Sequence, residues 1–150
     1  MTPETSVYEF AKRGLRRFPD KTALWFYGRS VSFRELFCRI DATANRLVSL
    51  GIRRGSVVTV HLPNCPQAVI VFYAVAKLGA ICNMVHAQTP AHGVKELMAF
   101  AESKCLFSHL PECVGIAEKT VLINIMPKTS DKGSMCEWVA LVLTMECSDG

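Results

Sequence analysis

Three histidines stand at or just past the ends of three successive apolar stretches of the sequence: His61, His86 and His109. In doubly wound sheets, ligands bind beyond the carboxyl ends of the strands, and neighbouring parallel strands lie about 5 Å apart. Histidine titrates near neutral pH, so three of them in one crevice could exchange protons with a substrate. The sequence pairs them with no acid or nucleophile, and we therefore favour ordinary loop or capping histidines.

Other residues that could do chemistry carry weaker signals. A thiol at a helix start, such as Cys65, can have a lowered pKa, but a small packed side chain is the favoured interpretation. The stretch Lys128–Ser134 combines hydroxyls, lysine and a glycine. One glycine cannot form the nest of amides that cradles phosphate, so a solvent loop is expected there. No catalytic or cofactor-binding residue is assigned, and no metal site is expected because the seven cysteines lack zinc-ligand spacing.

The elements that would position these residues alternate between strand and helix. Alternation of this kind predicts a mostly parallel sheet with flanking helices and right-handed crossovers, and hence an α/β fold. The expected elements are a strand at 57–62, a helix at 65–78, a strand at 80–85, a helix at 90–103, a strand at 105–107, a weaker helix at 111–117 and a strand at 120–125. Residues 127–134 read as a loop, and residues 135–145 are ambiguous between helix and strand.

A helix and a small β-hairpin are expected before this sheet. Two S-x-x-E patterns, at Ser6 and Ser32, are typical of capping boxes at helix starts. The first helix should run to about Arg17, and the second should end at Gly51 as a left-handed terminator. Between them, residues 22–27 and 30–31 are predicted to pair as a hairpin that turns at Gly28-Arg29.

The apolar stretch at residues 62–85 contains one charged side chain, Lys77. Its predicted helix of about 13 residues would span about 20 Å, which is too short for a hydrocarbon core of about 30 Å. No membrane span is therefore expected. A helix that is apolar on most sides is typical of the interior of a larger protein.

The composition is typical of a protein that folds around a packed core and resides inside the cell. The 150 residues are 50% hydrophobic, and the odd number of cysteines without a secretory signal indicates reduced thiols and a cytoplasmic location. Of the 17 lysines and arginines, 11 lie in residues 1–60. The arginines fall on outward helix faces with no stacking aromatics interleaved, so we interpret them as solvated and expect no nucleic-acid partner.

The ordered set of residues from Ser6 to about His109 resembles the amino-terminal portion of the adenylate-forming (AMP-binding) acyl-CoA synthetase and ligase superfamily. The helix-strand unit at residues 64–85 carries the most specific part of the resemblance. The matching features are Ser32-Phe-Arg-Glu-Leu36, Asn45-Arg-Leu47, Gly51, Arg54-Gly55, Asn64, Ala74 and Gly79-Ala80. Departures occur at Ser56, Gln67 and Ala87-Gln88, and residues 111–150 match poorly, whereas residues 1–110 match the family.

The resemblance implies activation of a carboxylate by ATP to an acyl-adenylate, followed by thioester formation, with ATP, Mg and coenzyme A in the intact family. The family's phosphate loop, aromatic-Gly-x-Thr-Glu motif, hinge aspartate and catalytic lysine have no counterpart in these 150 residues. Residues 1–150 are therefore expected to be a partial amino-terminal subdomain, an incomplete lobe that acts as scaffold and binds no cofactor alone. Its expected partner is the missing remainder of the ligase, or a second copy held through an exposed apolar patch.

Two alternatives remain open. The first is a self-sufficient flavodoxin-like α/β binding or interaction module. The second is a thiol- or histidine-based enzyme that uses a crevice at His61 and His86.

Overall fold

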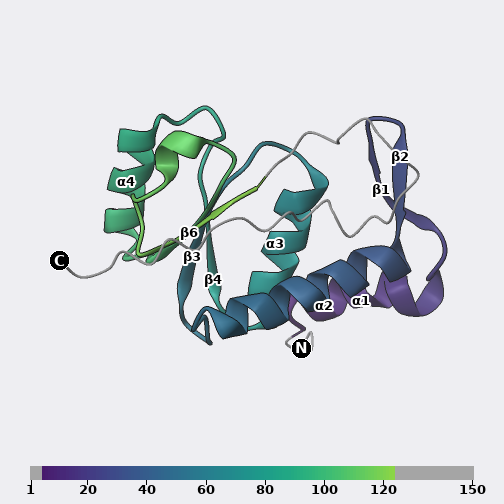
Figure 1. Cartoon of the computed structure of the whole chain (residues 1–150). Helices are drawn as coiled ribbons and strands as arrows, with labels where there is room; N and C mark the ends of the chain where they lie inside the picture. Colours follow the sequence, from purple (N-terminus) through teal and green to yellow (C-terminus); the bar gives the residue numbers. More distant parts are fainter. Residues whose placement is uncertain (1–4, 124–150) are drawn as a thin grey trace. The chain divides into compact units, whose positions relative to one another are not determined.

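The computed structural model describes residues 5–123 (Figure 1), which form two units. The first unit comprises residues 5–56 and 68–81, and the second comprises residues 57–67 and 82–123. Helices α1 (Val7–Arg17), α2 (Phe33–Ser49) and most of α3 (Pro66–Lys77) belong to the first unit, with strands β1 (Thr22–Phe26) and β2 (Arg29–Ser32). The second unit holds β3 (Val57–His61), most of β4 (Ile81–Met84), α4 (Ala91–Phe100), β5 (Cys105–Ser108) and β6 (Lys119–Leu122).

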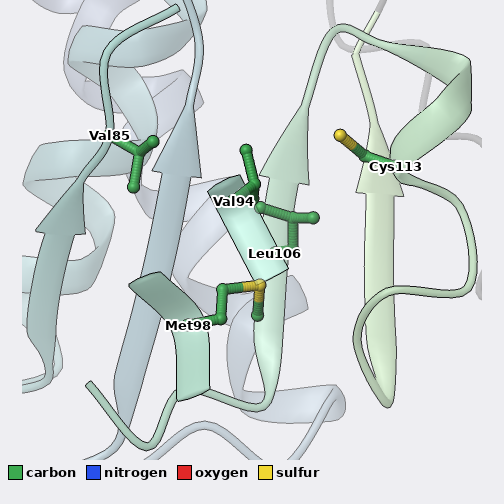
Figure 2. Close-up of a cluster of buried hydrophobic side chains, with 5 residues drawn as sticks. All are labelled: Val85, Val94, Met98, Leu106 and Cys113. Atoms are coloured by element: carbon green, nitrogen blue, oxygen red, sulfur yellow. The ribbon is translucent and has the colours of Figure 1, made fainter. Parts of the chain in front are cut away.

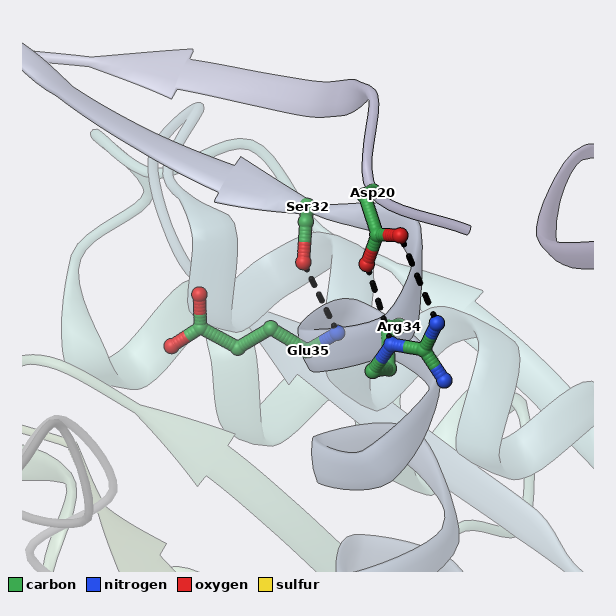
Figure 3. Close-up of polar contacts among 4 residues, drawn as sticks. All are labelled: Asp20, Ser32, Arg34 and Glu35. Atoms are coloured by element: carbon green, nitrogen blue, oxygen red, sulfur yellow. Dashed lines mark hydrogen bonds and ion pairs between the residues drawn. The ribbon is translucent and has the colours of Figure 1, made fainter. Parts of the chain in front are cut away.

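Serine side chains cap both α1 and α2, which is the serine half of each predicted capping box, whereas the carboxylates of Glu9 and Glu35 pair with Arg16 and Arg39. Oγ of Ser6 accepts a hydrogen bond from the amide of Glu9 at 3.1 Å, and Oγ of Ser32 accepts one from the amide of Glu35 at 3.2 Å (Figure 3). Each bond satisfies one of the amides that lack a partner in a first helical turn. The starts of both helices are thus fixed by local sequence.

The hairpin forms as predicted, but its turn lies one residue earlier. Tyr27 and Gly28 form a two-residue loop with φ values of +46° and +75°, and Arg29 already belongs to β2. Two successive positive φ values match the twist of a tight hairpin. Gly28 lies in the turn, as predicted. Tyr27 was not predicted there, because an aromatic residue rarely adopts a positive φ.

An arginine ties the segment after α1 to the start of α2. Nε of Arg34 donates to Oδ1 of Asp20 at 3.1 Å, and Nη2 donates to Oδ2 at 3.5 Å (Figure 3). The amide of Arg34 also donates to the carbonyl of Pro19 at 2.8 Å. This forked geometry holds the entrance to α2 against the turn that follows α1.

Within the first unit, α3 is joined to α1 and α2 through one carboxylate. Oδ1 of Asp41 accepts hydrogen bonds from Nζ of Lys77 at 2.8 Å and from the hydroxyl of Tyr8 at 3.1 Å. From Pro66 to Ala76 every residue of α3 is buried or half-buried. The prediction of an interior helix at 65–78 is confirmed, with bounds that are one residue shorter at each end.

The four-stranded sheet has the order β4-β3-β5-β6 and is parallel, as the alternating pattern predicts. When the four strands are numbered 1 to 4 in the order of the chain, they lie side by side in the order 2-1-3-4. This is the order in which a flavodoxin-like sheet begins, and it places a topological switch point between β3 and β5.

Helix α4 packs an apolar cluster against this sheet (Figure 2). Val94 and Met98 of α4 are 0% and 3% exposed, and they lie with Leu106 of β5, Val85 beyond β4 and Cys113. Spacing of four residues brings Val94 and Met98 to one face of the helix. This core of the second unit therefore combines one face of α4 with side chains of β5, of the segment after β4 and of the turn after β5.

The prediction of a helix at 111–117 is wrong. Only Pro111–Cys113 forms a single 3-10 turn, and Gly115 adopts a φ of +87°. A left-handed glycine ends helical geometry, and the buried side chain of Cys113 already anchors the turn. The predicted loop at 127–134 and the ambiguous stretch at 135–145 lie outside the described residues.

Candidate functional site

The parallel register places His61 opposite Ser108, the last residue of β5. Nδ1 of His61 lies 2.9 Å from Oγ of Ser108, and Oγ also accepts a hydrogen bond from the amide of Leu110 at 3.1 Å. The pair occupies the carboxyl ends of β3 and β5, which is the topological switch point of the sheet. This is where open α/β sheets bind ligands, so the pair is the candidate functional site.

Burial is the main cause of the lowered pKa of His61. Its side chain is 0% exposed, and within residues 5–123 Nε2 finds no hydrogen-bond partner of regular geometry. Burial lowers the pKa of His61 below 6.5, the positive charge that His109 can carry lowers it further, and the backbone of Ala87 and Thr89 opposes the shift. His61 is therefore neutral in the folded protein near pH 7.

A second histidine lies beside the first. The rings of His61 and His109 are 5.3 Å apart between centroids, and Nδ1–H of His109 donates to the backbone carbonyl of His61 at 3.1 Å. Sγ of Cys113 lies 3.9 Å from Nδ1 of His61. The carboxyl ends of β3 and β5 and the turn after β5 thus meet around one imidazole.

This arrangement resembles a serine and histidine pair by distance, but both side chains are fully buried. A nucleophilic serine must reach a substrate, and both Ser108 and His61 are 0% exposed. Among residues 5–123, no carboxylate bonds to the imidazole of His61 to orient it. The contact between Nδ1 of His61 and Oγ of Ser108 joins the ends of two adjacent strands, while Nε2 of His61 is left without a hydrogen-bond partner among the described residues.

The third predicted histidine does not join the site. His86 is exposed, and its Nδ1 accepts a hydrogen bond from the amide of Gln88 at 3.2 Å within its own loop. Cys65 is 5% exposed, as expected for a small packed residue. The structure therefore brings together His61 and His109 but leaves His86 in an exposed loop, bonded to Gln88.

Ser108 and Cys113 are members of the site that the sequence analysis did not name. Ser108 is the last residue of β5 and directly precedes His109. Its position at the end of a strand was the feature of the sequence that could have indicated a place in the site. Cys113 reaches His61 only through the turn at Pro111–Cys113, where the sequence predicted a longer helix. No local pattern links residue 113 to residue 61.

No disulfide is formed among the described cysteines, which are Cys38, Cys65, Cys82, Cys105 and Cys113. The reduced state of all seven cysteines stays a prediction. Burial raises the pKa of Cys82 to about 11 and that of Cys105 to about 12, the latter shift being opposed by Lys119. Both thiols stay protonated near neutral pH, and a protonated thiol is a poor nucleophile. Cys136 and Cys147 lie outside the described residues.

A cluster of aromatic residues and cations corrects the prediction that no stacking aromatics accompany the arginines. The guanidinium of Arg13 lies 5.3 Å from the ring centre of Phe10, and that of Arg17 lies 5.7 Å from the ring centre of Phe18. Nζ of Lys21 lies 4.5 Å from the same Phe18 ring. These are cation–π contacts on the outward side of α1 and just beyond it.

Within the part of the chain that the structure describes, no three histidine, cysteine or acidic side chains are grouped as a metal site. In that same range, no helix combines the length and the apolar character that crossing a bilayer requires.

Comparison with known proteins places this geometry in context. A family model described as "AMP-binding enzyme" matches residues 11–142. An acetyl-coenzyme A synthetase of Coprinopsis cinerea is 34% identical over 107 residues, covering 67% of this chain and 16% of the relative. A long-chain-fatty-acid–CoA ligase of Bacillus subtilis is 38% identical over 79 residues, covering 53% of this chain and 14% of the relative.

A solved structure agrees with the fold. The N-terminal subdomain of Klebsiella oxytoca NpsA, in complex with 3-hydroxybenzoyl-AMSN, superposes with a TM-score of 0.69 and 27% identity. The similarity covers 75% of this chain and 29% of that one. The chain thus spans 14–16% of the length of the two curated relatives above.

Proposed function

The chain belongs to the AMP-binding enzyme family, and from this premise we propose that residues 1–150 are a partial amino-terminal subdomain of an ATP-dependent carboxylate–CoA ligase. In this role the chain is scaffold and catalyses no adenylation alone. Carboxylate activation to an acyl-adenylate and thioester formation, with ATP, Mg and coenzyme A, belong to the larger assembly. The proposed location is the cytoplasm, which is supported by the odd number of cysteines in the sequence.

The proposal depends on the burial of His61 and Ser108 at the topological switch point between β3 and β5. A ligand-binding crevice would need open polar groups at the ends of β3 and β5, and His61 and Ser108 there are buried and bonded to each other. Adenylate formation also needs donors around the phosphates and a positioned cation for the charge that develops in transfer. The phosphate-loop motif that would supply them has no counterpart in the sequence.

Exposed apolar side chains support the expectation of a partner. Trp25 and Tyr27 on the hairpin are 71% and 84% exposed, and Phe100 on α4 is 92% exposed. Trp25 and Tyr27 stand two residues apart on one hairpin, and grouped exposed apolar residues often mark a surface that another protein covers. The proposed occupants are the remainder of the ligase or a second copy of the chain.

Carboxylate-dependent exchange of pyrophosphate into ATP tests the proposal. We expect the purified chain to give no exchange above background with acetate or a long-chain fatty acid, while the full-length Bacillus subtilis ligase serves as positive control. Cooperative urea unfolding of the same sample shows that the chain is folded. Robust exchange by the folded chain alone would overturn the scaffold assignment.

The flavodoxin-like alternative shares the observed strand order, so strand order cannot separate the two functions. Sedimentation velocity does separate them. A self-sufficient module predicts a monodisperse monomer at all concentrations, whereas an incomplete lobe with uncovered aromatics predicts self-association that rises with concentration.

A further inference from the structure

Helix α1 exposes a face that combines aromatic rings with unpaired cations. Phe10, Arg13 and Arg17 follow one another at intervals of three and four residues, and this spacing brings side chains to one side of a helix. All three are exposed, and Phe10 is 65% exposed. The opposite side of the helix carries Tyr8, which is 4% exposed and packs against Phe37 at a centroid distance of 5.7 Å.

The face continues beyond the end of the helix. Phe18, at 44% exposed, holds the guanidinium of Arg17 on its ring at 5.7 Å and the ammonium of Lys21 at 4.5 Å. We call Phe10, Arg13, Arg17, Phe18 and Lys21 the basic-aromatic face. It lies wholly within the first unit of the chain.

The charge of this region is not neutralised locally. Residues 5–34 contain seven lysines and arginines and two acidic residues, Glu9 and Asp20. Glu9 pairs with Arg16 at 3.5 Å, and Asp20 pairs with Arg34 at 3.1 Å. Among residues 5–123, Arg13, Arg17 and Lys21 therefore make no ion pair, and three positive charges remain for an external anion.

We propose that the basic-aromatic face docks onto the surface of an anionic lipid bilayer. Amphipathic helices that lie in a membrane interface carry lysine and arginine beside exposed Phe or Leu, and anionic headgroups attract each cation. The rings of Phe10 and Phe18 would enter the boundary between headgroups and acyl chains, while Arg13, Arg17 and Lys21 contact lipid phosphates. Such a helix lies on the membrane and does not span it.

The positions of the cations favour a bilayer over a single-stranded nucleic acid. Nucleic acids bind such surfaces by stacking bases on open ring faces. Here a guanidinium or ammonium already lies over each ring, at 4.5–5.7 Å from its centre. A lipid interface accepts a ring from its edge and needs no open ring face.

Vesicle flotation tests the proposal with the full chain. We expect the chain to float with vesicles of phosphatidylcholine mixed with phosphatidylserine and to stay unbound with vesicles of phosphatidylcholine alone. The double variant Arg13→Glu/Arg17→Glu should weaken binding by about tenfold or more, because each cation near an anionic surface is worth about 1 kcal/mol. Phe10→Ala should weaken binding several-fold while leaving the salt dependence intact.

The matched control reverses two exposed charges elsewhere, in the variant Arg53→Glu/Lys95→Glu, which has the same net charge as the test variant. Retained binding of this control and of Arg13→Lys/Arg17→Lys supports the face as the site. Equal loss in the two charge-reversal variants would overturn the proposal, as would the absence of binding to phosphatidylserine vesicles. Displacement from the vesicles by an equimolar single-stranded oligonucleotide would also overturn it in favour of a nucleic-acid site.

This docking is independent of the proposed ligase role, since flotation needs neither ATP nor a carboxylate. Far-UV circular dichroism of each variant verifies that α1 remains folded. If charge reversal disrupted the helix, Arg13→Gln/Arg17→Gln provides a milder variant, for which unchanged binding would contradict the proposal.

Discussion

Nδ1 of His61 lies 2.9 Å from Oγ of Ser108, and the two residues are register partners at the ends of adjacent parallel strands. The hydrogen bond joins residues that are 47 positions apart in the sequence. Because loops leave β3 and β5 at this point, one side-chain bond fixes where both loops begin. Both side chains are fully buried at the point where the topology would offer a site to a ligand.

Stability should fall in mild acid because of His61. Burial lowers its folded pKa below the value of 6.5 in the unfolded chain. The unfolded state therefore takes up a proton first, and the free energy of unfolding decreases as the pH falls from 6.5 to the lowered folded pKa. Urea unfolding across this range should show a smaller pH dependence for His61→Gln than for wild type.

His86→Gln is the control for that experiment, because His86 is exposed. Its pH profile should follow that of wild type. An unchanged profile for His61→Gln would show that the buried imidazole does not control acid sensitivity.

Removal of the Ser108 hydroxyl should destabilise the second unit. Ser108→Ala leaves Nδ1 of His61 and the amide of Leu110 without their shared partner, and one buried group left unpaired costs about 1–3 kcal/mol. A double-mutant cycle with His61→Gln should give a coupling energy of about 0.5 kcal/mol or more. Ser49→Ala, at an exposed hydroxyl that bonds only within its own helix, should change stability by about 0.5 kcal/mol at most. Additive effects of Ser108→Ala and His61→Gln would mean that the bond contributes nothing to stability.

Truncation should affect two large side chains of α4 to very different extents. Met98 is 3% exposed within the apolar cluster, so Met98→Ala opens a cavity and should cost about 2–5 kcal/mol. Phe100 is 92% exposed, and Phe100→Ala should change the free energy of unfolding by about 0.5 kcal/mol or less. Chemical denaturation of both variants measures the difference. Similar losses in the two variants would contradict the packing of α4 against the sheet.

The ion pair of Lys77 and Asp41 should contribute to stability until strongly alkaline pH. The hydrogen bond from Lys77 to Asp41 raises the pKa of Lys77 above 10.5, and burial partly opposes this shift. The contribution is complete below pH 10.5 and is lost as the pH rises through the raised value. Both side chains are partly solvated, so Asp41→Asn should cost only about 1 kcal/mol at neutral pH.

The check is the difference in unfolding free energy between wild type and Asp41→Asn as a function of pH. We expect a constant difference near neutrality that shrinks above pH 10.5. Glu118→Gln is the matched control, since its pair with Lys104 is longer, at 3.9 Å, and more exposed. A difference that stays constant in alkali would exclude Lys77 as its source.

The features that could be predicted from the sequence are those determined by residues only a few positions apart. Ser6 and Ser32 cap helices through amides three positions away, and the apolar run of α3 marks its own burial. The alternation of strand and helix then implied a parallel sheet, because such connections have one favoured hand.

The features that could not be predicted depend on register or on the direction of single side chains. Nothing near His61 in the sequence indicates that Ser108 lies opposite it, so a candidate proton-transfer residue could not be distinguished from a buried structural one. The cations over Phe10 and Phe18 depend in the same way on side-chain directions that helical spacing leaves open. The family resemblance located the fold but assigned no role to any of these residues.

The two units of the chain are each assembled from separated segments, since residues 57–67 leave the first unit and residues 68–81 return to it. During synthesis, the carboxylate of Asp41 must therefore wait for Lys77 to leave the ribosome before the first unit is complete. Contacts between distant segments slow folding because the loop between them must close first. A newly made chain will expose the apolar residues of α3 after they leave the ribosome and until they pack, and binding by a chaperone at this stage would protect it from aggregation.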